Sequence, residues 1–180
     1  MNKKRGLGWR LLFLFMPLLL GVACDDDNSE GVAIGSLTSE EFVQRAAASD
    51  LFEIQTGNLA LQKSTMAEVR DFAQEIINDH TASSQELALL TQKKNIQMPT
   101  TLPEDKQNSV NRLSGLSGTG FDKAFSDEQE AAHEEAIELY ERAAEDLKDA
   151  DLRAFAQRTL PVLRMHLEHA RALEELTDDM

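Results

Sequence analysis

The sequence predicts an all-α fold, a four-helix bundle built from two antiparallel helix pairs. Four segments, residues 39–63, 66–94, 121–148 and 150–176, carry apolar residues at helical spacing. Only one or two residues separate the members of each pair, so the paired helices are expected to run antiparallel. The one long connection, residues 95–120, suits a chain that travels the length of a bundle before the second pair begins. Two pairs joined by one long crossover form the ferritin-like version of the four-helix bundle.

The first 23 residues have the pattern of a secretory signal peptide. They contain four basic residues and no acidic residue, and an apolar run covers residues 11–20. This run is shorter than the roughly 20 apolar residues that a membrane-spanning helix needs. We therefore expect residues 1–23 to direct export and to be removed, rather than to remain as a membrane anchor.

Cys24 is the only cysteine, and it directly follows Gly21-Val22-Ala23. This arrangement resembles the lipobox of bacterial lipoproteins, in which the cysteine becomes the lipid-bearing first residue. The Leu usual three positions before that cysteine is Gly21 in this chain, so ordinary cleavage after Ala23 is the alternative. We expect Cys24 to anchor the protein to the inner or the outer membrane, facing the periplasm, with residues 24–38 as a flexible acidic tether.

The mature chain is strongly acidic. Removal of the signal peptide leaves 14 basic residues against 32 acidic ones, a net charge of −18. Such a charge repels nucleic acids and anionic lipid head groups and attracts cations, although solubility alone also favours an acidic surface. The sequence contains no Gly-rich phosphate-binding loop and no nucleophile elbow. These observations exclude a nucleic-acid partner and give no support to the common hydrolase and nucleotide-binding classes.

The first helix pair has sequence signals for helix starts and small residues where a neighbouring helix could pack closely. Two acidic residues follow Ser39, and Thr65 with Glu68 matches the capping-box pattern of a helix start. Gly57 and Ala60 are small enough to let a neighbouring helix approach closely. The residues expected to face the core are Val43, Ala47, Ile54, Gly57 and Leu61, and then Val69, Phe72, Ala73, Ile76, Ile77, Leu87 and Leu90.

The crossover and the second pair follow. Pro99 and Pro103 exclude a helix in the first part of the crossover, whereas residues 104–116 fit a short one. Asp149 is expected to cap the last helix, and the bundle domain is expected to span residues 39–177. The residues expected to face the core are Phe125, Ala132, Ala136, Leu139, Ala143 and Leu147, and then Leu152, Phe155, Leu163, Leu173 and Leu176.

Several short motifs resemble a known family. They are Phe42-Val43 with Ala46-Ala47, Glu53-Ile54 through Gly57-Asn58-Leu59-Ala60-Leu61, Val69-Arg70-Asp71-Phe72-Ala73, Asp79-His80-Thr81, Leu113-Ser114-Gly115-Leu116 with Gly120-Phe121-Asp122, His133-Glu134-Glu135-Ala136, Phe155-Ala156, and Thr159 through Leu167. Across residues 41–176 the chain thus resembles the bacterial domain-of-unknown-function family 4142, exported proteins described as outer-membrane proteins. The resemblance implies a ferritin-like helical bundle and export, and it implies no established activity.

Three histidines, His80, His133 and His166, fall on or beside the inward faces of three different helices. A helix rises by about 1.5 Å per residue. His133 and His166 each lie 16 residues from the joint of the last two helices, so they should sit at the same height. The same count from the joint of the first two helices puts Asp50 level with His80 and Glu53 about one turn away.

Imidazole and carboxylate groups on facing helices are the usual ligands of metals inside helical bundles. They suit Zn, Fe, Mn or Cu, so the expected cofactor is a divalent transition metal. A di-iron centre is not expected, because the Glu-x-x-His spacing that such centres use twice occurs at one inward histidine only. The candidate ligands are Glu53, His80, His133 and His166, with Asp50 and Glu130 as further candidates.

Buried histidines also occur without a metal, bonded to a carboxylate of the next helix. Pairs such as Asp50–His80 and Glu134–His166 would satisfy them in that way, while His169 is expected to be partly exposed. Three functions therefore stay open: an envelope binding or stress-related protein with a metal site, a non-metal module that binds another envelope protein or itself, and a metal-dependent oxidoreductase. The sequence assigns no catalytic residue and favours binding over catalysis.

Overall fold

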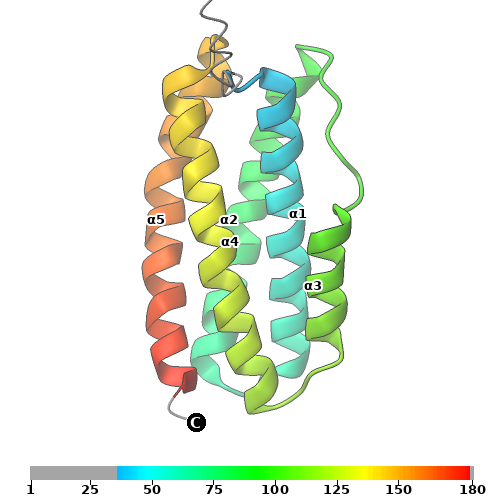
Figure 1. The fold of residues 1–180 in the computed structure, drawn as a ribbon, viewed down its shortest axis with the longest axis vertical. Helices are drawn as coiled ribbons and strands as arrows, with labels where there is room; N and C mark the ends of the chain where they lie inside the picture. Colours follow the sequence, from blue (N-terminus) through cyan, green and yellow to red (C-terminus); the bar gives the residue numbers. More distant parts are fainter. Residues whose placement is uncertain (1–35, 179–180) are drawn as a thin grey trace, which may run out of the picture. The chain divides into compact units, whose positions relative to one another are not determined.

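The computed structural model describes residues 36–178 and confirms the all-α bundle. Residues 1–23, predicted to be a signal peptide, and Cys24 lie outside the described residues. Within them there are five helices and no strand (Figure 1). The helices are α1 (Ser39–Lys63), α2 (Ala67–Gln92), α3 (Glu104–Ser114), α4 (Thr119–Asp146) and α5 (Ala150–Asp178).

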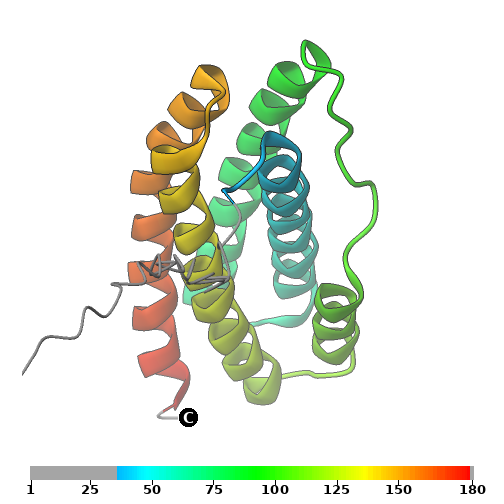
Figure 2. The ribbon, with the colours of Figure 1, turned by 45° about the horizontal axis from the view of Figure 1, so that its top comes forward.

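Four long helices form the bundle, and the short one lies outside it. α1 packs against α2 and α4, and α5 packs against the same two helices. The crossover leaves the end of α2, runs along the outer side of α1 and continues into α3, which contacts α1 and α4 (Figures 1 and 2). Lys106 of α3 is held to α4 by an ion pair to Glu135, with Nζ 2.6 Å from Oε2. The expected ferritin-like connection is therefore present, including the short helix within the crossover.

The helix starts confirm one predicted cap and correct another. Asp149 Oδ1 accepts hydrogen bonds from the backbone N–H groups of Asp151 and Leu152, both at 3.1 Å, so Asp149 caps α5 as expected. The Thr65 capping box was wrong: α2 begins at Ala67, its cap position is Met66, and no side chain caps it. Because the helix starts later than the pattern suggested, Thr65 lies one residue before the cap position.

The domain also begins slightly earlier than expected. Leu37, in the segment predicted as a tether, is 4% exposed and packs in the same cluster as Phe42 and Val43. Thr38 caps α1, since its Oγ1 accepts a hydrogen bond from the N–H of Glu41 at 3.1 Å. Gly35–Met180 forms a compact unit that contains its own hydrophobic core, so this segment is expected to fold by itself. Within residues 36–178, no helix is both long enough and apolar enough to cross a membrane.

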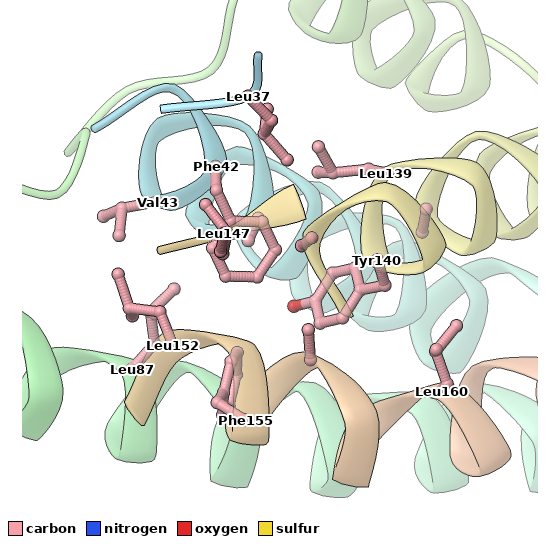
Figure 3. Packing of buried hydrophobic residues seen from close by; sticks show 14 of the residues in the cluster. Leu37, Phe42, Val43, Leu87, Leu139, Tyr140, Leu147, Leu152, Phe155 and Leu160 are labelled. Atoms are coloured by element: carbon pink, nitrogen blue, oxygen red, sulfur yellow. The ribbon is translucent and has the colours of Figure 1, made fainter. Parts of the chain in front are cut away.

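The hydrophobic core consists of two clusters, one towards each end of the bundle. The first is built around Phe42, Tyr140 and Phe155, with the rings of Phe42 and Tyr140 5.2 Å apart (Figure 3). The second is built around Phe72 and Phe125. On every long helix, a buried polar residue lies between the residues of the first cluster and those of the second; these polar residues are Asp50, Glu53, His80, His133 and His166.

One expected core residue is exposed, and four others are only partly buried: Ile54, Leu61, Ile77 and Leu90. Leu176, in the last helical turns of α5, is 50% exposed. It lines a surface groove together with Glu68 and Asp71 of α2 and does not point to the bundle centre. Helical periodicity gave the correct face over most of α5 but placed this residue too far inward near the helix end.

The close approach of α1 and α2 depends on Gly57. A Cβ at this position would lie 2.8 Å from Cγ1 of Ile77 and 3.2 Å from the backbone oxygen of Ala73. We expect Gly57→Ala to lower the free energy of unfolding by about 1–2 kcal/mol, because the clash outweighs the gain in helix propensity. Urea unfolding measures the change.

Two further variants test this reason. Gly120→Ala, where the added carbon meets no atom within 4 Å, should leave stability unchanged or raise it. The cost of Gly57→Ala should shrink when Ile77→Ala is also present. A Gly57→Ala domain more stable than the unmodified one would show that the helices do not require the glycine.

Candidate metal centre

His80 of α2, His133 of α4 and His166 of α5 meet in the middle of the bundle. Their relative exposures are 3%, 1% and 0%. The ring centroids lie 5.3, 5.6 and 5.7 Å apart, which is nearly an equilateral triangle. One nitrogen from each ring lies within 4.8 Å of the others, so the three could hold one metal ion. We call this group the histidine triad.

Each ring is fixed by a hydrogen bond through its outer nitrogen. His80 Nδ1 lies 2.9 Å from Asp50 Oδ1, as the helix rise predicted. His133 Nδ1 lies 2.8 Å from the backbone oxygen of Gln129, and His166 Nε2 lies 2.9 Å from Asp79 Oδ2. Carbonyl and carboxylate oxygens only accept, so these outer nitrogens donate. Metal-binding histidines are commonly oriented in this way by a second layer of acceptors.

The inner nitrogens of neutral rings must then carry lone pairs. They are His80 Nε2, His133 Nε2 and His166 Nδ1. The first is buried and has no hydrogen-bond partner. The other two lie 3.3 Å apart, and two lone pairs at that distance repel each other unless a cation or a proton lies between them. Tetrahedral metal–nitrogen bonds of about 2.0–2.1 Å separate two ligand nitrogens by about 3.3–3.4 Å. The observed spacing fits a shared metal ion.

Two buried carboxyl groups on α1 lie next to the triad. Asp50 and Glu53 are 2% and 1% exposed. Asp50 Oδ2 and both oxygens of Glu53 have no hydrogen-bond partner. Burial raises the pKa of Glu53 to about 7, and the nearby His80 limits this rise. Unpaired buried anions are costly, so these groups favour a positive charge in the same layer.

The histidines differ in how well they accept a proton. Burial, together with the charge of His80, lowers the pKa of His133 to about 3. Burial also lowers the pKa of His166. For His80 burial acts in the same direction, but the Asp50 hydrogen bond and the charges of neighbouring carboxylates raise its pKa overall. The layer thus accepts one positive charge readily, as a proton on His80 or as a bound ion, and resists protons on the other two rings.

Not all sequence candidates lie at the triad. The carboxylate of Glu130 accepts a hydrogen bond from Arg171 Nε at 2.8 Å, so this residue is not brought to the three rings. The Glu-x-x-His spacing made Glu130 a candidate ligand beside His133, but Glu130 lies on the outer side of α4. The expected pair of Glu134 with His166 was also wrong, because Glu134 bonds the same arginine at 2.6 Å.

The sequence reasoning missed Asp79, which takes the place expected for Glu134. Asp79 directly precedes His80, and adjacent residues on a helix point in different directions, so the inward face predicted for His80 did not include it. The structure shows why it matters: α5 packs against α2, and Asp79 points across that seam to His166. Its presence in the Asp79-His80-Thr81 motif was the signal that could have identified it.

Comparison with solved structures finds two helical bundles of similar fold. A DUF305 fragment from Deinococcus radiodurans matches with a TM-score of 0.67 and 13% identity, covering 78% of this chain and 95% of that one. CopM in its Cu(II)-bound form matches with a TM-score of 0.66 and 14% identity, covering 78% and 98%. At these identities the likeness shows the helical bundle alone.

Comparisons of the sequence identify the family. A search of curated proteins finds no match. The family model of DUF4142, a domain of unknown function, matches residues 27–173. That span includes all three triad histidines and the two carboxylates of α1. The family resemblance of the short motifs is thereby confirmed, and the chain belongs to the DUF4142 family.

Proposed function

We propose that the protein binds one divalent transition metal ion, Zn(II) or Cu(II), at the histidine triad. The observation that carries this proposal is the convergence of three inner nitrogens, each on a ring whose other nitrogen is already bonded. Three imidazoles suit Zn(II) and Cu(II), and divalent-metal affinity generally reaches its maximum at Cu(II). The buried carboxylates Asp50 and Glu53 would neutralise the charge of the ion.

The geometry favours holding a metal over catalysis at the metal. The triad rings are at most 3% exposed, so a substrate has little access to an ion between them. A bundle of the same fold, CopM, was solved in a Cu(II)-bound form, which supports including copper among the metals tested. We therefore infer a role in binding, buffering or passing on metal ions.

Calorimetric titration of the chelator-treated Gly35–Met180 unit tests the proposal. Zn(II), Cu(II), Mn(II) and Fe(II) are added separately. We expect one ion per chain to bind tightly, and His133→Ala and His166→Ala to abolish this binding. His133→Phe, which keeps a ring but no nitrogen, covers the case in which the alanine variant does not fold. His169→Ala, which removes an imidazole outside the triad, should retain a bound ion; weak binding unchanged in all variants would refute the metal site.

We also propose that the protein is an exported lipoprotein anchored through Cys24. The support is the signal-peptide pattern of residues 1–23 and the cysteine that follows it. Cys24→Ser is expected to shift the protein from the membrane fraction to the soluble exported fraction, because stable anchoring needs the attached acyl chains. Cell fractionation with mass spectrometry of the mature N-terminus measures this. An unmodified N-terminal cysteine in the wild-type protein would instead indicate ordinary cleavage after Ala23.

A further inference from the structure

A second group of side chains that could hold a metal ion lies on the outer side of the α2–α5 seam. Glu75 and Asp79 are one turn apart on α2, and His166 and His169 are one turn apart on α5. His169 Nδ1 lies 3.0 Å from Glu75 Oε2. One ligand atom each from Glu75, Asp79 and His166 lie within 4.8 Å of one another. We call Glu75, Asp79 and His169 the seam cluster.

The seam cluster is open to solvent, in contrast to the triad. The side chains of Glu75, Asp79 and His169 are 33%, 42% and 49% exposed. Glu75 and His169 also line a surface groove along the seam. The cluster contains two carboxylates and one imidazole, which are ligands that Zn(II) and Cu(II) accept.

His166 joins this cluster to the triad. Its Nε2 bonds Asp79 in the seam cluster, while its Nδ1 faces His133 in the triad. The outer nitrogens of the other two triad rings bond groups inside the bundle, Asp50 and the Gln129 backbone. Among the triad histidines, His166 alone therefore contacts a partly exposed partner.

We propose that the seam cluster captures the metal ion from solvent and loads it into the triad through His166. This inference rests on the proposed metal binding at the triad. A neutral imidazole offers one lone pair, so His166 can serve the cluster or the triad but not both. With the ion outside, the His166 proton lies on Nδ1, towards His133; with the ion inside, it lies on Nε2, towards Asp79. Loading thus requires the ion to move from the Nε2 side of the His166 ring to the Nδ1 side, and the ring proton to move the opposite way, from Nδ1 to Nε2.

The sharing of His166 also explains why the cluster is a loading site and not a second storage site. An ion held outside occupies the nitrogen that bonds Asp79 and leaves the triad with two ligands. With an ion held inside, His166 bonds Asp79 again and the ion has three ligands. Both positions offer three ligands, but only the inner one keeps the Asp79–His166 bond and lies beside the buried carboxyl groups of α1. We therefore expect the ion to rest inside and the outer groups to act on the rate at which it arrives.

The test measures the loading rate of Zn(II) separately from the amount bound. The Gly35–Met180 unit is mixed with Zn(II), a strong chelator is added after set times, and protein-bound zinc is counted after desalting. We expect Glu75→Gln with His169→Ala to slow loading by about tenfold or more, because the capturing charge and ligands are lost. The zinc bound at equilibrium should remain one ion per chain.

The controls separate the loading route from the triad. Glu145→Gln removes the same charge at an exposed site on α4 and should load at the unmodified rate. Unchanged loading in the seam variant would overturn the capture role, and loss of its equilibrium binding would show that Glu75 and His169 belong to the final site. If the unmodified domain never holds zinc, the proposed metal binding itself fails.

Discussion

Saturating Zn(II) is expected to raise the free energy of unfolding of the Gly35–Met180 unit by about 4 kcal/mol when free zinc is 1,000 times its dissociation constant. The size follows because the triad exists only in the folded chain, where three helices place one nitrogen each at its centre. The unfolded chain keeps the histidines but not their arrangement. Urea unfolding with Zn(II) and with chelator measures the difference.

In this experiment each variant is unfolded with zinc and with chelator, so its own metal-free stability is the reference. His133→Phe should show no difference between zinc and chelator, whatever its stability without metal. His169→Ala should keep nearly the whole gain, because this residue lies outside the triad. A zinc effect of equal size in both variants would place the ion on the acidic surface and would contradict the triad as the site.

Replacing Glu53 by Leu should stabilise the metal-free domain by about 1–4 kcal/mol and weaken zinc binding by at least about tenfold. Glu53 is 1% exposed, and neither of its oxygens has a hydrogen-bond partner. Without an ion the carboxyl group therefore has lost its hydration without gaining a hydrogen bond, and the nearby charges of His80 and Lys106 compensate only in part. With an ion in the layer, the same group supplies a nearby negative charge.

The two opposite effects identify the role of Glu53. Chemical unfolding of the chelated protein gives the first, and zinc titration gives the second. Glu145→Leu makes the same replacement at an exposed position and should change neither by much. A Glu53→Leu domain that loses stability without metal would show that the carboxyl group is satisfied in the apo protein, and the argument from its missing partners would be wrong.

The sequence was sufficient for the fold and for heights along the bundle, but not for directions around each helix. Counting residues from the helix joints placed Asp50 level with His80 and His133 level with His166, because helix rise is nearly constant. In the structure, His80 Nδ1 lies 2.9 Å from Asp50 Oδ1, and His133 Nε2 lies 3.3 Å from His166 Nδ1.

The remaining details depend on how one helix pair lies against the other, and local periodicity does not contain that information. Glu130 was predicted near the triad from its spacing to His133, yet it faces Arg171 on the surface. Asp79 was overlooked, yet it bonds His166 across the seam between α2 and α5. Both outcomes follow from rotation about helix axes that only the packed tertiary structure fixes.

The polar layer between the two apolar clusters also determines the axial register of the helices. Sliding α5 by one turn, about 5.4 Å, past its neighbours would move His166 away from Asp79 and His133 and into one of the apolar clusters. A purely apolar interior would tolerate such shifts more easily, because one Leu or Phe contact can replace another. The same residues that suit a metal ion thus select a single alignment of the four long helices before any ion binds.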